Sequence, residues 1–275
     1  MTTAIAPVIP RSRGQRLYWT FADGCVIARG NLVHLARNPA AILNLLLYPI
    51  VMVLLFGFVF GSAMNVAGGG DYREFLMPGM FGQTMTLGVM TTMIIVANDA
   101  ARGVTDRFRS MPISRAGVVL GRAVADMVNS VLELAVLLLC GLAVGWSWHR
   151  GLANALTALG LLLLLRFALI WVGIYLGLIL TPESAGAAWM PLMPLTMLAN
   201  TFVSPELMPG WMGALSEWNP LSATVAACRE LFGNPGWGGD SWAAEHALPL
   251  AIGWPVLLTL VFLPLSARRY RRLDR

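Results

Sequence analysis

Two ionisable residues lie deep inside apolar stretches of this 275-residue chain: Glu133 in VNSVLELAVLLL and Arg166 in LLLLLRFALIW. The loop between these stretches is centred near His149 and Arg150, and the two charges are nearly equidistant from that centre. Two antiparallel helices of equal rise therefore place them at the same depth. Because an unpaired charge in hydrocarbon is costly, we predict that Glu133 and Arg166 form an intramembrane pair. The pair could line a substrate path or clamp two helices, and its position alone favours neither.

A second concentration of charge lies between two apolar stretches, in the segment NDAARGVTDRFRSMPISRAGVVLGR that ends at Arg122. Arg102, Asp106 and Arg109 recur at helical spacing, so one helix face presents all three. The helix ends before Pro112, because the residue that precedes a proline is disfavoured in helical geometry. We predict a short, rigid elbow that carries directed charge. It could anchor the chain at a membrane surface or dock onto another protein.

No catalytic constellation stands out in the chain. It contains neither a nucleophile elbow nor a zinc-protease helix motif. All 19 basic residues are arginines, and a phosphate-binding loop of the G-x-x-x-x-G-K-[ST] type requires a lysine. The three cysteines and three histidines are scattered, so we expect no metal site and no disulfide framework. We therefore expect a protein that is not an enzyme and has no ATP site of its own.

The elements that position these charges are apolar helices. The chain is 57% hydrophobic and 12% charged, whereas soluble domains carry roughly 25% charged residues. Its apolar residues form long blocks rather than alternating runs, which predicts an all-α integral membrane protein and not a barrel. Six blocks are long enough to cross a bilayer, near residues 41–62, 76–98, 118–145, 153–180, 186–204 and 246–267. The fifth block is interrupted by Pro191 and Pro194.

Apart from Arg166, the arginines are distributed unevenly along the chain, with Arg122 counted in the loop after the second block. Fifteen lie in the leader, in the loop after the second block and in the tail, whereas the alternate loops hold only Arg73, Arg150 and Arg229. By the positive-inside rule, both termini and the elbow face the cytoplasm. An even number of spans follows from this orientation, in agreement with six.

Three regions result from this division of the chain. Residues 1–40 form a cytoplasmic leader, 41–267 a transmembrane domain and 268–275 a basic tail. Within the leader, the segment from Gln15 to Arg37 mixes aromatic and aliphatic residues with arginines, which favours a helix lying in the membrane interface. A plain cytoplasmic helix or a flexible tail is the alternative.

The last external loop, 205–245, is too long for a simple connection between spans. It contains tryptophans and apolar residues, but too many polar ones to cross a membrane. We predict short amphipathic helices that dip into the outer leaflet and are broken at Pro209 and Pro220. A solvent-exposed folded loop is the alternative.

Three stretches of the chain resemble the type-2 ABC (ABC-2) transporter permeases, of the subgroup typified by daunorubicin/doxorubicin exporter permeases. They are ARNPAAILNLLLYPIVMVLLFGFVFG, the elbow GVTDRFRSMPISRAGVVLGR, and NTFVSPELMPGWMGALSEWNPLSATVAACREL. The third resembles the family's external Met-Pro-x-Trp and Asn-Pro segment, which places Pro209, Trp211, Asn219 and Pro220 in that motif.

This resemblance implies that the elbow is a coupling helix, which docks into a cleft on a separate ATPase subunit that binds ATP and Mg. Many relatives have a glutamate near the start of the elbow, where this chain has only Asp99. The residues implied in the contact or in shaping it are Asp99, Arg102, Asp106, Arg107, Phe108, Arg109 and Pro112. Two ATPase copies and two permease copies, identical or paralogous, would form the unit in a bacterial plasma membrane, with lipid but no nucleic acid as a further partner.

The resemblance also implies export of a hydrophobic compound, such as an antibiotic or a lipid, from the cytoplasm or the inner leaflet. No large external domain is present to receive substrate from a binding protein. Three alternatives remain open: export of lipid-linked polysaccharide, a non-transporting membrane assembly factor, and an ion-driven carrier. A carrier would show several acidic residues at the midplane, where only Glu133 is expected.

Overall fold

The computed structural model describes residues 50–56, 71–102, 115–236 and 241–272, and the single residues Val33, Arg37, Leu43 and Leu47. Most of the leader, most of the predicted first span and the central part of the elbow lie outside the described residues.

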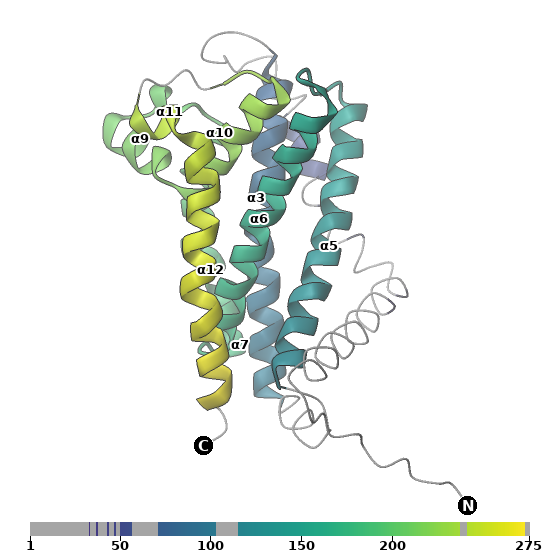
Figure 1. Cartoon of the computed structure of the whole chain (residues 1–275), viewed down its shortest axis with the longest axis vertical. Helices are drawn as coiled ribbons and strands as arrows, with labels where there is room; N and C mark the ends of the chain where they lie inside the picture. The colour runs from purple at the N-terminus through teal and green to yellow at the C-terminus, as the bar shows by residue number, and fades with distance from the viewer. Residues whose placement is uncertain are drawn as a thin grey trace, which may run out of the picture.

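Four long helices run side by side through the described part of the chain (Figure 1). They are α3 (Tyr72–Ala101), α5 (Arg115–Ala143), α6 (Gly151–Gly177) and α12 (Ala247–Arg272). Each is long and apolar enough to cross a membrane, and no other described helix is. They match the second, third, fourth and sixth predicted spans. Helix α6 is central, because it packs against α3, α5 and α12.

The predicted fifth span is not one continuous helix. The chain forms α7 (Pro182–Ala187) and then α8 (Trp189–Met197), with the break at Ala188. Pro191 explains the break, because a proline has no backbone N–H and its ring clashes with the carbonyl four residues earlier. That carbonyl belongs to Ala187, the last residue of α7. The prediction of a single helix over 186–204 is therefore corrected to two short helices.

The segment after α8 folds at one end of the bundle (Figure 1). It forms η2 (Pro205–Leu207), α9 (Gly210–Glu217), α10 (Pro220–Phe232) and α11 (Trp242–Glu245). Pro209 directly precedes α9 and Pro220 is the first residue of α10, where a missing N–H costs nothing. We call this end of the bundle the outer-loop end. The opposite end, where α3 ends and α5 begins, is the elbow end.

Helix α10 does not stay at the surface but packs along α3, α6 and α12. At Gly82 of α3, an added Cβ would lie 2.6 Å from Val225 Cγ2 and 2.8 Å from Leu221 Cδ1. The contact between α3 and α6 is equally close, since a Cβ on Gly177 would lie 2.6 Å from the Met93 carbonyl oxygen. Small residues at such positions let membrane helices approach closely. The bundle around α3 is therefore held by tight backbone packing.

Candidate functional site

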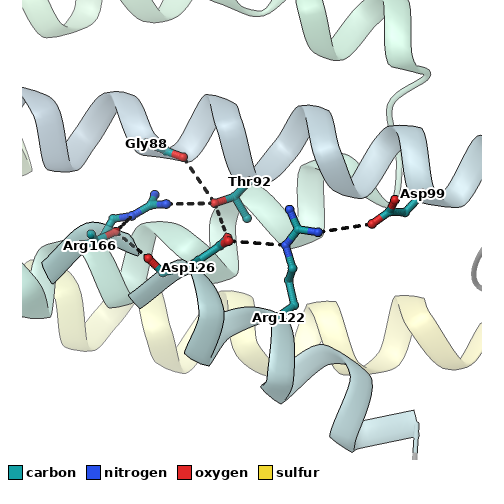
Figure 2. Close-up of polar contacts among 7 residues, drawn as sticks. Gly88, Thr92, Asp99, Arg122, Asp126 and Arg166 are labelled. Carbon is teal, nitrogen blue, oxygen red and sulfur yellow. Dashed lines mark hydrogen bonds and ion pairs between the residues drawn. The ribbon is translucent and has the colours of Figure 1, made fainter. Parts of the chain in front are cut away.

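Polar side chains recur every fourth residue on α5, at Arg122, Asp126 and Ser130. This spacing puts them on one helix face, and Figure 2 shows that face directed toward α3 and α6. Asp126 and Ser130 are 8% and 2% exposed, so both are buried. An otherwise apolar helix thus carries a polar stripe into the interior of the bundle.

Arg122 connects this stripe to the elbow end. Its Nη1 donates a hydrogen bond to Asp99 Oδ2 near the end of α3, at 3.3 Å. Its Nε forms an ion pair with Asp126 Oδ1 one turn further along α5, at 3.5 Å. The two ends of the elbow are therefore joined at their base by one arginine (Figure 2).

Thr92 of α3 continues the contacts toward the middle of the bundle. Its Oγ1 lies 2.7 Å from Asp126 Oδ2 and 3.3 Å from the Gly88 carbonyl oxygen. A hydroxyl has a single proton, so it donates its hydrogen bond to the closer carboxylate of Asp126. The same oxygen accepts a hydrogen bond from Arg166 Nη2 at 3.1 Å. Thr92 therefore joins Asp126 to Arg166.

Arg166 ends the chain of contacts on α6, where it is only 4% exposed. Its Nε donates to Ser130 Oγ at 2.8 Å, and Ser130 Oγ donates to the Asp126 carbonyl oxygen at 2.7 Å. Asp99, Arg122, Asp126 and Arg166 carry two negative and two positive charges. We call these four residues, together with Thr92 and Ser130, the polar chain. Its two negative charges balance its two positive charges, and this balance offsets much of the free-energy cost of burying them.

Gly88 makes room for the Arg166 guanidinium. A Cβ at this position would lie 2.7 Å from Arg166 Cζ and 2.8 Å from its Nη1. We expect Gly88→Ala to displace the guanidinium and to lower the free energy of unfolding by about 1–3 kcal/mol. Gly160→Ala on α6 is the matched control, because nothing lies within 4 Å of a Cβ there. Thermal unfolding of the two purified variants measures their stabilities. Equal unfolding midpoints would contradict the role of Gly88 in making room for Arg166.

A second buried arginine, Arg229 of α10, lies near the outer-loop end and is 0% exposed. Its Nε donates to the Phe75 carbonyl oxygen at 2.9 Å, and its Nη2 donates to those of Asn200 and Thr201 at 2.9 and 3.2 Å. Its Cζ also lies 3.6 Å from the centre of the Phe75 ring. Burial lowers the pKa of the guanidinium to about 9, so it remains a cation at neutral pH. Arg229 thus fastens α10 to α3 and to the turn after α8.

The start of α10 is fastened by Asn219. Its Oδ1 accepts a hydrogen bond from the Leu221 N–H at 2.9 Å, which caps the helix. Its Nδ2 donates to the Leu195 carbonyl oxygen at 3.0 Å and so joins α10 to α8. Trp211 behaves differently from these residues, since it is 68% exposed on α9.

Sequence comparison assigns most of the chain to one family. Residues 24–232 match the family of ABC-2 type transporters. The chain belongs to this ABC-2 family. The family comprises the membrane subunits of ABC transporters, so this ABC-2 protein is a membrane transport subunit that works with an ABC ATPase.

Three relatives illustrate the range of similarity within the ABC-2 proteins. The chain is 31% identical to the daunorubicin resistance ABC transporter permease protein DrrB1 of Streptomyces coeruleorubidus, over 85% of this chain and 80% of that protein. It is 28% identical to the probable multidrug ABC transporter permease YbhR of Escherichia coli (strain K12), over 59% of this chain and 44% of that protein. It is 23% identical to the putative transport permease ycf38 of Cyanophora paradoxa, over 86% of this chain and 83% of that protein.

The elbow of this ABC-2 protein is described only at its ends. Asp99 lies in the last turn of α3 and contacts Arg122. Arg102 directly follows α3 as its C-cap residue and is exposed. The remaining predicted elbow residues lie outside the described residues; they are Asp106, Arg107, Phe108, Arg109 and Pro112. Their contact with an ATPase stays a prediction.

The predicted intramembrane pair has a different geometry from the one expected. Glu133 is close enough to Arg166 to act on it electrostatically, but the hydrogen bonds of Arg166 go to Ser130 and Thr92. No direct ion pair joins Glu133 and Arg166 in the described part of the chain. Asp126 was not predicted from the sequence, although the four-residue spacing of Arg122, Asp126 and Ser130 on α5 is a signal that could have revealed it.

Proposed function

We propose that this ABC-2 protein is the permease subunit of an exporter that moves hydrophobic, drug-like compounds or lipids out of the cytoplasm or the inner leaflet. One observation carries the proposal: 31% identity to a daunorubicin resistance permease over 85% of the chain. A separate ATPase subunit would bind ATP and Mg and supply the energy, because the chain lacks the lysine of a phosphate-binding loop.

The proposed topology has six spans over residues 41–267, between a cytoplasmic leader (1–40) and a cytoplasmic tail (268–275), in a bacterial plasma membrane. Four long helices support it, and α7 and α8 together supply a broken fifth span. Helix α7 lies at the elbow end and α9 at the outer-loop end, so the chain between them crosses the bundle (Figure 1). The arginine distribution supports a cytoplasmic elbow end.

Coupling to the ATPase would enter through the elbow. Two ATPase copies would dock onto the elbows of two permease copies, with the substrate path between the permeases. Closure of the ATPase pair would then shift the permeases between inward-open and outward-open states. The polar chain supports this proposal, because it connects the base of the elbow at Asp99 with Arg166 inside the bundle.

Co-purification tests the proposal directly. The chain, co-expressed with an ABC ATPase from the same organism, should purify as a complex whose ATP hydrolysis is stimulated by an exported compound. Cells that produce both proteins should also accumulate less of that compound. A chain that purifies without any ATPase, in cells where deletion of that ATPase changes neither resistance nor accumulation, would overturn the proposal.

The contact between Asp99 and Arg122 allows a more specific prediction about coupling. Asp99→Asn should change the stability little, because a partly exposed ion pair contributes only about 0–1 kcal/mol. Substrate stimulation of ATP hydrolysis should nevertheless fall about fivefold or more, while basal hydrolysis persists. Glu183→Gln removes the same charge from an exposed position on α7 and should leave stimulation intact. Equal stimulation in both variants would contradict a coupling role for the contact.

A further inference from the structure

A cavity of about 410 Å³ lies among α3, α6, α8 and α12. Its walls include Val89, Met90 and Met93 of α3 and Leu165 of α6. Met90, Met93 and Leu165 are 4%, 2% and 1% exposed, so the cavity reaches into the core of the bundle. Its volume falls in the range of roughly 300–1,000 Å³ that is usual for small-molecule sites.

The polar side chains in these walls form hydrogen bonds with backbone groups of the chain. The Thr86 hydroxyl donates to the Gly82 carbonyl oxygen at 2.9 Å, and the Thr196 hydroxyl donates to that of Met193 at 3.0 Å. Asn219 uses its amide to join α10 and α8. No charged side chain is among the described residues that line the cavity. A charged group placed inside would lose its hydration without compensation, so the cavity selects for uncharged, apolar groups.

A second hollow, a groove of about 300 Å³, serves as a comparison, because we expect it to face lipid. It lies between α5 and α6 and is lined by Leu120, Val124 and Val131, which are 42%, 36% and 46% exposed. Bilayer acyl chains can reach such a groove from the side. The walls of the larger cavity are mostly buried or half-buried, and only Pro191 and Leu195 of α8 are exposed among its lining residues. This greater depth favours a specific small molecule as its occupant.

We propose that the larger cavity binds the uncharged, apolar body of the exported compound. This inference rests on the proposed function and adds a binding site within a single permease chain. Met90 and Met93 can adapt their flexible side chains to ligands of different shape. Helix α8 supplies one wall, and the break at Ala188 separates this wall from α7.

The cavity and the polar chain share two helices. Val89, Met90 and Met93 line the cavity on the same turns of α3 that carry Thr92. On α6, Leu165 lines the cavity directly beside Arg166. A bound compound therefore contacts the helices that hold the polar chain. We expect occupancy of the cavity and the state of the elbow to influence each other.

Photolabelling of the permease–ATPase complex in lipid nanodiscs tests the site. The probe is an uncharged polycyclic aryl diazirine, and labelled residues are identified by mass spectrometry. Labelling should occur on α3 and α8 residues of the cavity and should be displaced by an excess of an exported compound. Val172→Phe, which fills the cavity from α6, should reduce it roughly tenfold or more. Leu192→Phe, from α8, is a second filling variant in case the first folds poorly.

Val131→Phe is the matched control, because it makes the same change in the lipid-facing groove. Equal labelling of the cavity in Val172→Phe, Leu192→Phe and Val131→Phe overturns the site. So does displacement by an excess of a fatty-acyl lipid without displacement by an exported compound, since the occupant is then a lipid chain. If the filling variants keep substrate-stimulated ATP hydrolysis and efflux, the site fails while the exporter stands. If no compound stimulates the wild-type complex, the proposed function itself fails.

Discussion

Replacement of Arg166 by methionine should destabilise the protein strongly and abolish substrate-stimulated ATP hydrolysis. The arginine donates to Ser130 and Thr92 and balances the charge of Asp126 inside the bundle. Removal of one charged partner from a buried set of balanced charges lowers the free energy of unfolding by about 3–5 kcal/mol. Thermal unfolding in detergent should show a midpoint lowered by on the order of 10 °C.

Second substitutions in the Arg166→Met background identify the partner of the arginine. Asp126→Asn should recover part of the lost stability, because it restores the charge balance of the polar chain. Glu133→Gln should recover less, since Thr92 connects Asp126 to Arg166 by hydrogen bonds, and Asp126 acts on the arginine more strongly than Glu133 does. The opposite order of rescue would show that the originally predicted pair of Glu133 and Arg166 is the dominant one. A cycle of single and double variants separates the two couplings.

Replacement of Arg229 by leucine should release α10 from the bundle. Three backbone carbonyls would lose a charged donor, and hydrogen bonds to charged groups contribute about 1.5–3 kcal/mol each. We expect the loss in unfolding free energy to exceed ~3 kcal/mol. Arg229→Lys should retain only part of the stability that Arg229→Leu loses, because a single ammonium group cannot reproduce the planar set of N–H donors of a guanidinium.

The control for Arg229 is an arginine at the same end of the bundle. Arg150 is exposed, so Arg150→Leu should change the stability by no more than about 0.5 kcal/mol. Limited proteolysis of the loop that follows α10 offers an independent readout, since a detached α10 exposes that loop. If Arg229→Leu and Arg150→Leu unfold at the same temperature and are cleaved at the same rate, Arg229 does not fasten the helix.

The long helices could be predicted from the sequence because span length is set by the thickness of the bilayer. Helix α6 offers the clearest case, since its 27 residues contain only one charge. The fifth span could not be predicted as two helices from hydropathy. Pro191 and Pro194 were visible, but membrane helices often tolerate prolines, so the residues alone did not locate the break at Ala188.

The partner of Arg166 was missed for a reason of geometry. Equal distances from the connecting loop set the depth of the Cα atoms of Glu133 and Arg166, but they do not set where a long side chain reaches. Ser130 and Glu133 are three residues apart, a rise of about 4.5 Å, which is within the reach of an arginine. Only the packed bundle decides between them, and it directs the Nε of Arg166 to Ser130.

Arg229 was missed because its partners are distant in the sequence. It was counted among the external arginines, and α10 has only 13 residues, too few for a span. Its bond to the Phe75 carbonyl oxygen joins positions 154 residues apart. A single sequence contains no local signal for such a contact. The motif positions Asn219 and Pro220, in contrast, could be predicted as a helix start because a cap and an N-terminal proline are local features.

The order of charges along the polar chain limits how the helices can move past one another. Asp99 of α3 lies opposite Arg122 of α5, and the next residue of the stripe on α5 is Asp126, one turn away. A slide of α3 by one turn toward the outer-loop end would bring Asp99 next to Asp126, so two carboxylates would meet. This register is electrostatically unfavourable, whereas a rotation that carries α3 and α5 together preserves the contacts between these two helices. If the elbow docks onto an ATPase as proposed, we expect a push on it to tilt α3 and α5 together as a rigid pair.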